Sequence, residues 1–316
     1  MRLQSLAGFS AFEASSAGGK GRFAAAVMVA AAFQASNLPG AELKPATAAA
    51  FDRYVQATQA RIDRELARPG GFLYIEGLAP ARRDEVLHNL REGGIYIERL
   101  ETRDAAGNEI EIPDGLVHHW IGAVFVPGST VAQAIALAQD YNHHQDTYRP
   151  EVIGSRLERR NGNDFKVYYR LRKQKVITVT LNTWHDVEYF RVDDSHWHGR
   201  SASMRIAEVA DAGQAGEHEL PVGNDGGFLW RLDSWWRYEQ MEGGVAIEAE
   251  SVSLTRDIPT GLGWLIGPFV TSIPKESLRM TLENTRQALR ARASAETRST
   301  NARVIPAPRR TKKPRE

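Results

Sequence analysis

The histidines are the side chains of this chain best suited to acid–base or metal chemistry. His118 and His119 are adjacent in an alternating apolar stretch, so in a strand they point to opposite faces and do not chelate one metal together. His196 and His198 share one strand face, as metal ligands on a strand do. Because no acid or third histidine stands at a diagnostic spacing from either pair, we expect no metal site and no cofactor.

Residues 228–239 alternate between aromatic and charged side chains, which predicts a strand with two unlike faces. A Gly243-Gly244 turn separates this run from a second alternating run, residues 245–256, and predicts a β-hairpin. The aromatic face offers apolar bulk and one hydroxyl: Trp230, Leu232, Ser234, Trp236 and Tyr238, with Ile247 opposite them. Such a face suits a mostly apolar ligand that carries a polar group, although the same side chains equally suit plain core filling.

The other face of this predicted hairpin is charged. Depending on the turn, Arg237 lies opposite Glu248 or Glu250, on the same face as Arg231 and Asp233. In one interpretation these groups form a solvated ladder of cross-strand pairs on the outer surface of the sheet. In the alternative, the alternation is inverted and the charges form the polar floor of a cavity.

The elements before the hairpin begin with a strand over residues 117–126. A helix begins near Ser129 or Thr130, either of which can cap it, and a second short helix follows over residues 141–148. His143 and His144 lie in this second, polar turn, so we expect both to be exposed.

Only strands and turns separate the second short helix from the hairpin. The predicted strands are residues 152–160, 165–172, 176–190 and 197–209. From about Pro274, apolar and small residues recur at helical spacing, which predicts a long helix with one stripe packed on the sheet.

The order strand, two short helices, six strands, long helix resembles the START-like (SRPBCC) helix-grip superfamily, which groups polyketide cyclases, pollen-allergen-like proteins and lipid-transfer domains. Residues 114–120, 228–239 and 253–266 are similar to an uncharacterised bacterial branch of it. The resemblance covers residues 113–290. It implies an α+β fold in which a curved antiparallel sheet of about seven strands wraps around the C-terminal helix, with an apolar cavity between them. Because the superfamily includes binders and enzymes, the resemblance implies no catalytic residue.

Two further residues are candidates for the lining of that cavity. One is Trp264, which follows Gly261 and Gly263. These glycines predict that the segment approaches the sheet closely, either as a gate or as a helical turn broken at Pro268. If a histidine acts as an acid or base, we expect it to be the one of the adjacent pair that faces the cavity, and we assign His119 to the lining.

The N-terminal part divides into a leader, residues 1–41, and a small α/β elaboration, residues 42–112. In the leader, a basic flank precedes an apolar run over residues 23–33, the layout of a secretory signal that predicts a periplasmic or secreted protein. The alternative is a disordered leader on a cytoplasmic protein. In the elaboration we expect helices near residues 47–67 and 80–92 and strands near 72–76 and 95–100.

Composition narrows the set of partners. Forty basic and 39 acidic side chains leave a net charge of +1, so no global field recruits nucleic acid. Residues 291–316 are basic, contain three prolines and have few large apolar groups, which predicts a disordered tail whose weak contact would be with an anionic surface. The absence of cysteine excludes disulfides and thiolate catalysis.

Three functions are compatible with these observations. The first is an exported, non-catalytic binding protein for a lipid-like or aromatic small molecule. The second is a cyclase- or hydrolase-type enzyme that uses a cavity histidine as acid or base. The third is a structural or partner-binding protein that acts through its basic tail.

Overall fold

The computed structural model describes residues 40–175, 177–258, 261 and 263–304, with the side chains of 264–271 and 296–304 left out. The predicted secretion signal, residues 305–316 of the tail and the side chain of Trp264 therefore lie outside the described residues.

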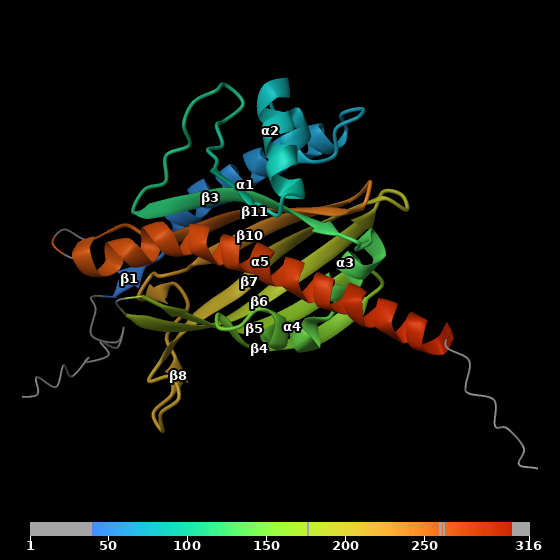
Figure 1. The fold of residues 1–316 in the computed structure, drawn as a ribbon. Coiled ribbons are helices and arrows are strands. Elements are labelled where there is room, and N and C mark those ends of the chain that lie inside the picture. The colour runs from blue at the N-terminus through green and yellow to red at the C-terminus, as the bar shows by residue number, and fades with distance from the viewer. Residues whose placement is uncertain (1–39, 176, 259–260, 262, 305–316) are drawn as a thin grey trace, which may run out of the picture. The chain divides into compact units, whose positions relative to one another are not determined.

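A large antiparallel sheet dominates the fold (Figure 1). Nine strands form it in the order β2-β3-β11-β10-β7-β6-β5-β4, with β8 paired to β7. Seven of them are the strands predicted for the helix-grip part, β2 is the strand predicted near residues 95–100, and β8 was not predicted. The strands are β2 (Tyr96–Arg99), β3 (Gly115–Pro127), β4 (Val152–Asn161), β5 (Asp164–Gln174), β6 (Thr178–Arg191), β7 (His196–Ala210), β8 (His218–Glu219), β10 (Arg231–Met241) and β11 (Gly244–Arg256). A separate short pair joins β1 (Ala41–Glu42) to β9 (Asn224–Asp225).

Helices cover both faces of this sheet (Figure 1). The long helix α5 (Gly263–Val304) lies across what we call the inner face, with α3 (Val131–Ala138), η3 (Tyr141–His143) and α4 (His144–Thr147) beside it. The outer face is covered by α1 (Pro45–Leu66), η2 (Tyr74–Gly77) and α2 (Pro80–Arg91). This arrangement confirms the predicted α+β helix-grip fold.

The two faces have separate apolar cores. On the inner face, Leu278, Leu282 and Leu289 of α5 pack with the predicted Ile247 and Tyr238. On the outer face, Phe51 and other apolar residues of α1 pack against the opposite side of β10 and β11.

The hairpin β10–β11 has the predicted turn and register. Arg237 lies opposite Glu248, one of the two registers expected, and Gly243 has a positive φ of 79° in the turn. Gly244 can only be glycine, because a Cβ there would lie 2.3 Å from the carbonyl oxygen of Val126.

Three predicted boundaries were wrong. Residues 72–76 contain the 3₁₀ turn η2 instead of a strand, because the backbone amides of Tyr74 and Ile75 turn toward the buried Glu248 carboxylate. The helix expected from about Pro274 begins at Gly263, so the segment treated as a gate or a broken turn is part of α5. The same helix continues past residue 290 to Val304, so residues 291–304 are helical instead of disordered.

Residues 42–112 are built into the sheet and its outer layer. β2 pairs with β3, and α1 buries Phe51, Tyr54 and Ile62 against the sheet. The described residues belong to one compact unit, Phe33–Glu316.

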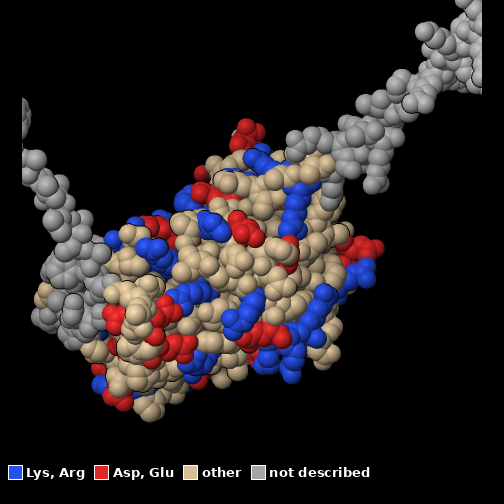
Figure 2. All heavy atoms as spheres, turned by 90° about the horizontal axis from the view of Figure 1, so that it is seen from below, with Lys and Arg blue, Asp and Glu red and all other residues tan. Residues whose placement is uncertain are grey.

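Among the described helices, none is long and apolar enough to cross a membrane. Figure 2 shows basic and acidic side chains interspersed on the face of the molecule seen from below. On that face, no single sign of charge prevails, in agreement with the net charge of +1.

Candidate ligand cavity

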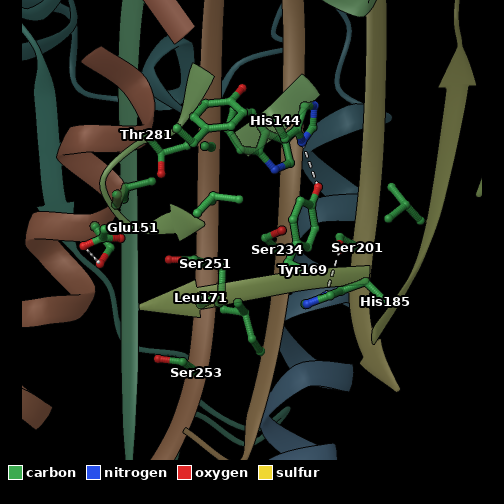
Figure 3. Close-up of a pocket in the computed structure, with 18 of the residues that line it drawn as sticks. His144, Glu151, Tyr169, Leu171, His185, Ser201, Ser234, Ser251, Ser253 and Thr281 are labelled. Atoms are coloured by element: carbon green, nitrogen blue, oxygen red, sulfur yellow. Dashed lines mark hydrogen bonds between the residues drawn. The ribbon is translucent and has the colours of Figure 1, made fainter. Parts of the chain in front are cut away.

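A cavity of about 290 Å³ lies between α5 and the inner face of the sheet (Figure 3). Its walls come from α3, η3, α4, α5 and the strands β4, β5, β6, β7, β10 and β11. Most of the lining is aliphatic or aromatic, and the apolar residues include Ala134, Leu137, Ala138, Val152, Leu171, Leu181, Val187, Phe228, Leu229, Ile273, Pro274 and Leu278.

Four residues of the predicted aromatic face line this cavity: Leu232, Ser234, Trp236 and Tyr238. They have the same parity in β10, so their side chains all point toward α5. Ile247 is fully buried on the same face, where it belongs to the core around α5 and does not line the cavity.

Trp230, predicted for the same face, lies elsewhere. It precedes the first residue of β10, so strand alternation does not fix its direction. Its indole donates a hydrogen bond to Asp225 Oδ1 at 3.1 Å, and the ring packs in the outer core with α1.

The assignment of His119 to the cavity was wrong. Odd-numbered residues of β3 face outward, where the His119 ring lies 2.7 Å from Glu250 Oε1 and 3.0 Å from the Tyr54 hydroxyl. Its neighbour His118 faces inward, but its ring contacts Thr255 Oγ1 at 3.0 Å and does not line the cavity. Neither adjacent histidine is therefore placed to act on a ligand there.

A row of serine hydroxyls crosses the floor of the cavity (Figure 3). Ser201, Ser234 and Ser251 stand opposite one another on β7, β10 and β11, and Ser253 follows on β11. Among the described residues, the hydroxyls of Ser234, Ser251 and Ser253 have no hydrogen-bond partner. These hydroxyls are free to bind a ligand.

His144 and Tyr169 form a hydrogen-bonded pair in the cavity wall, with His144 Nδ1 2.9 Å from the Tyr169 hydroxyl (Figure 3). His144 Nε2 lies 3.3 Å from the carbonyl oxygen of Leu137, which can only accept, so Nε2 carries the proton and Nδ1 accepts from Tyr169. Burial lowers the pKa of His144 to about 4. The expectation that His144 is exposed was wrong, whereas His143 is exposed on the same turn.

His185 is a second cavity histidine, on β6. Its ring lies 3.0 Å from Thr183 Oγ1 and 3.4 Å from Ser201 Oγ. Burial lowers the pKa of His185 to about 4, so the ring is neutral at neutral pH.

The charged groups of the cavity wall are paired with each other. Lys173 of β5 contacts Glu151 and donates to Ser277 Oγ of α5 at 2.8 Å. Ser277 donates to the other oxygen of Glu151 at 3.0 Å. Burial lowers the pKa of Lys173, against the opposing effect of the Glu151 carboxylate. This cluster joins the β5 end of the sheet to α5.

The charged face of the hairpin matches neither predicted alternative. It points away from the cavity, as the first interpretation required, but the side chains of Arg237, Glu248 and Glu250 are at most 3% exposed. Arg237 Nη2 lies 2.6 Å from Glu65 Oε2, and Arg61 also contacts Glu250, so α1 covers the ladder.

Sequence reasoning missed His144, Tyr169 and His185 as cavity residues. A signal existed for His185, because residues 181–189 alternate and place it on the same face as the apolar Leu181 and Val187. No such signal marks His144, since the residues around it are polar and show no apolar period.

No family model matches the chain, and no curated protein matches it in sequence. Its strands and helix nevertheless have the START-like, helix-grip arrangement, and solved structures of that kind resemble it.

One is a STAR-related lipid transfer protein fragment from Xanthomonas axonopodis, 15% identical with a TM-score of 0.40, which covers 61% of this chain and 98% of that one. Human STARD10 is 9% identical with a TM-score of 0.40, over 67% of this chain and 75% of that one. The di-domain aromatase/cyclase (ARO/CYC) StfQ from the steffimycin pathway is 13% identical with a TM-score of 0.37, over 57% and 53%. These similarities concern the fold and do not identify a ligand or a reaction.

Proposed function

We propose that this chain binds a small apolar molecule with a polar group in the cavity under α5 and carries or senses it without chemical change. The observation that supports the proposal most directly is the combination of an apolar wall with serine hydroxyls that lack protein partners. A hydrogen bond between a ligand oxygen and one of these hydroxyls would contribute about 0.5–1.5 kcal/mol to binding.

The size of the cavity limits the ligand. Its volume of about 290 Å³ is at the lower end of the range of roughly 300–1,000 Å³ that ligand pockets span. A single short chain or a compact ring system fits this volume better than a lipid with two long chains.

The chemical groups of the wall favour binding over catalysis. Both cavity histidines are neutral, and His144 has both ring nitrogens engaged by protein groups. A base with a pKa of about 4 takes up protons poorly near neutral pH. An efficient general base has a pKa close to the pH of the medium.

Protein purified without detergent tests the proposal. We expect native mass spectrometry to show a co-purified apolar molecule, or the emptied protein to take up the neutral fluorophore N-phenyl-1-naphthylamine. Ser251→Phe fills the cavity and should abolish uptake, whereas Ser195→Phe places the same ring in a turn outside the cavity and should not. Wild-type protein that neither carries nor takes up an apolar molecule would refute the proposal.

A second candidate function is acid–base catalysis of the cyclase type, favoured by the His144–Tyr169 pair inside the cavity. Such a pair would exchange protons next to a ligand carbonyl. The test is deuterium incorporation into 2-decanone in heavy water, measured by mass spectrometry with wild type and Tyr169→Phe. Equal incorporation with and without protein would remove this candidate.

We also propose that the protein is exported, on the basis of the basic flank and apolar run in residues 20–33. Residues 1–45 fused to a phosphatase that is active only outside the bacterial cytoplasm should give an active reporter. An inactive fusion that accumulates at full length would contradict export.

A further inference from the structure

Among the side chains that the structure describes, the cavity contains no charge that a ligand could neutralise. Glu151 and Lys173 are paired with each other, and the histidines His144 and His185 are neutral because burial lowers their pKa values to about 4. Arg200, whose backbone position also borders the cavity, directs its guanidinium to Asp233 on the outer face at 3.3 Å.

Glu250 likewise borders the cavity while its carboxylate lies on the outer face, against Arg61 and His119. Every titratable acid, lysine, arginine or histidine that the described residues contribute to the lining is thus paired, turned away or neutral.

Neutral hydrogen-bonding groups, in contrast, are left without partners. Ser253 is 6% exposed and Tyr238 is 2% exposed, and both line the cavity. Neither hydroxyl has a hydrogen-bond partner among the described residues, and the same holds for Ser234 and Ser251. A serine hydroxyl can donate one hydrogen bond and accept two, so the row can bind an alcohol or a carbonyl oxygen.

Resting on the proposed function, we infer that the cavity selects an uncharged ligand, an alcohol or ketone on an apolar skeleton, whose oxygen hydrogen-bonds the serine row Ser234–Ser251. A carboxylate or ammonium group of a ligand would enter a largely apolar space. The two charged side chains there, Glu151 and Lys173, are already paired with each other. Burial of a charge without a free counter-charge is strongly unfavourable. A neutral oxygen satisfies the serines without that penalty.

The test uses ligands that share one carbon chain and differ in the end group: decane, 1-decanol, 2-decanone, decanoate and decylamine. Each competes with N-phenyl-1-naphthylamine for the full chain at neutral pH. We expect 1-decanol and 2-decanone to displace the fluorophore at concentrations at least about tenfold lower than the charged compounds require, because burying a charge without a free counter-charge costs more than the ~1.4 kcal/mol that corresponds to a tenfold change in affinity.

The double variant Ser234→Ala/Ser251→Ala should weaken 1-decanol by about tenfold and leave decane unchanged. Ser195→Ala, which removes a hydroxyl outside the cavity, is the matched control and should change neither. Because the two hydroxyls have no protein partner, the double variant should fold with wild-type stability.

The outcomes separate the two claims. Decanoate or decylamine that binds as tightly as 1-decanol, or more tightly, would overturn the inference. An equal loss of affinity for decane and 1-decanol in the double variant would also overturn it. Both outcomes leave the binding function in place. If no compound and no fluorophore binds to wild type, the binding function fails as well.

Discussion

Polar side chains on the two faces of β10 and β11 have opposite surroundings. On the inner face, Ser234 and Ser251 have no partner among the described residues. On the outer face, Arg237 contacts Glu65, Glu248 and the carbonyl oxygen of Phe72. At the scale of single residues, the inner groups are available to a ligand, whereas the outer groups hold α1 and η2 to the sheet.

Arg237→Ala should destabilise the protein by about 3–5 kcal/mol, because it leaves buried carboxylates without their counter-charge. Urea unfolding followed by circular dichroism measures the change. Arg82→Ala, which removes an exposed partner of Glu85, is the control and should not shift the midpoint. A loss for Arg237→Ala below about 1 kcal/mol would show that the network is not a main support of the outer layer.

Glu248 should make stability depend on pH. Burial raises its pKa from 4.5 to about 7, against the opposing effects of Arg237 and the backbone amides of Tyr74 and Ile75. The folded state therefore binds the proton more tightly than the unfolded state, and this stabilisation is complete below about pH 4.5 and lost as the pH rises through about 7.

Glu248→Gln cannot titrate, so the stability of wild type minus that of the variant should decrease between about pH 5 and pH 8. Parallel urea titrations at several pH values measure this difference. A constant difference across that interval would contradict the raised pKa. Glu85→Gln on α2 controls for the loss of one carboxylate.

At the scale of elements, β3 and α5 pack closely together at Gly122. A Cβ at this position would lie 2.7 Å from Leu282 Cδ1 and 3.0 Å from the carbonyl oxygen of Tyr96. The absence of a side chain on β3 therefore allows α5 to lie against the sheet, and it does so beside the cavity.

Gly122→Val should lower the free energy of unfolding by about 1–3 kcal/mol, because the added methyl groups overpack this contact. Leu282→Ala removes the atom they meet, so the double variant should lose less stability than the sum of the single variants. Thermal unfolding of all four proteins gives the comparison. Strict additivity would show that the valine does not act through α5.

Local alternation was enough to limit the hairpin to two registers, one of which the structure has, and to predict the inward side of Ser234, Trp236 and Tyr238. It failed outside the regular strand, because Trp230 lies just before β10 and its side chain packs in the outer core. The direction of His119 depends on which face α5 covers, and that is a tertiary fact absent from the spacing of adjacent histidines. The burial of His144 also depends on distant partners, Tyr169 and the Leu137 carbonyl.

At the scale of the whole molecule, residues 42–112 are an integral part of the sheet and its outer layer and not a separate elaboration. They supply strand β2 and the helices that bury the outer face, and Arg61 and Glu65 of α1 complete the buried charge network. Without them, the charged ladder and a large apolar surface would be open to water.

A chain that starts at Pro113 should therefore aggregate or fail to unfold cooperatively, whereas a chain that starts at Gly40 should fold. Size-exclusion chromatography and thermal melts followed by circular dichroism distinguish the two. A soluble, cooperatively unfolding chain from Pro113 onward would show that the helix-grip part is independent of the preceding residues.

The opposite faces of β10 and β11 also guard against mispairing during folding. If one of these strands slipped by a single residue, all its side chains would change sides. A slipped β10 would press Asp233 and Arg237 against the apolar side of α5 and turn Ser234 toward α1, away from its place in the cavity. The ion pairs formed with α1 thus favour the native register. The serine hydroxyls reach the cavity floor only in the strand pairing that also brings Arg237 to Glu65.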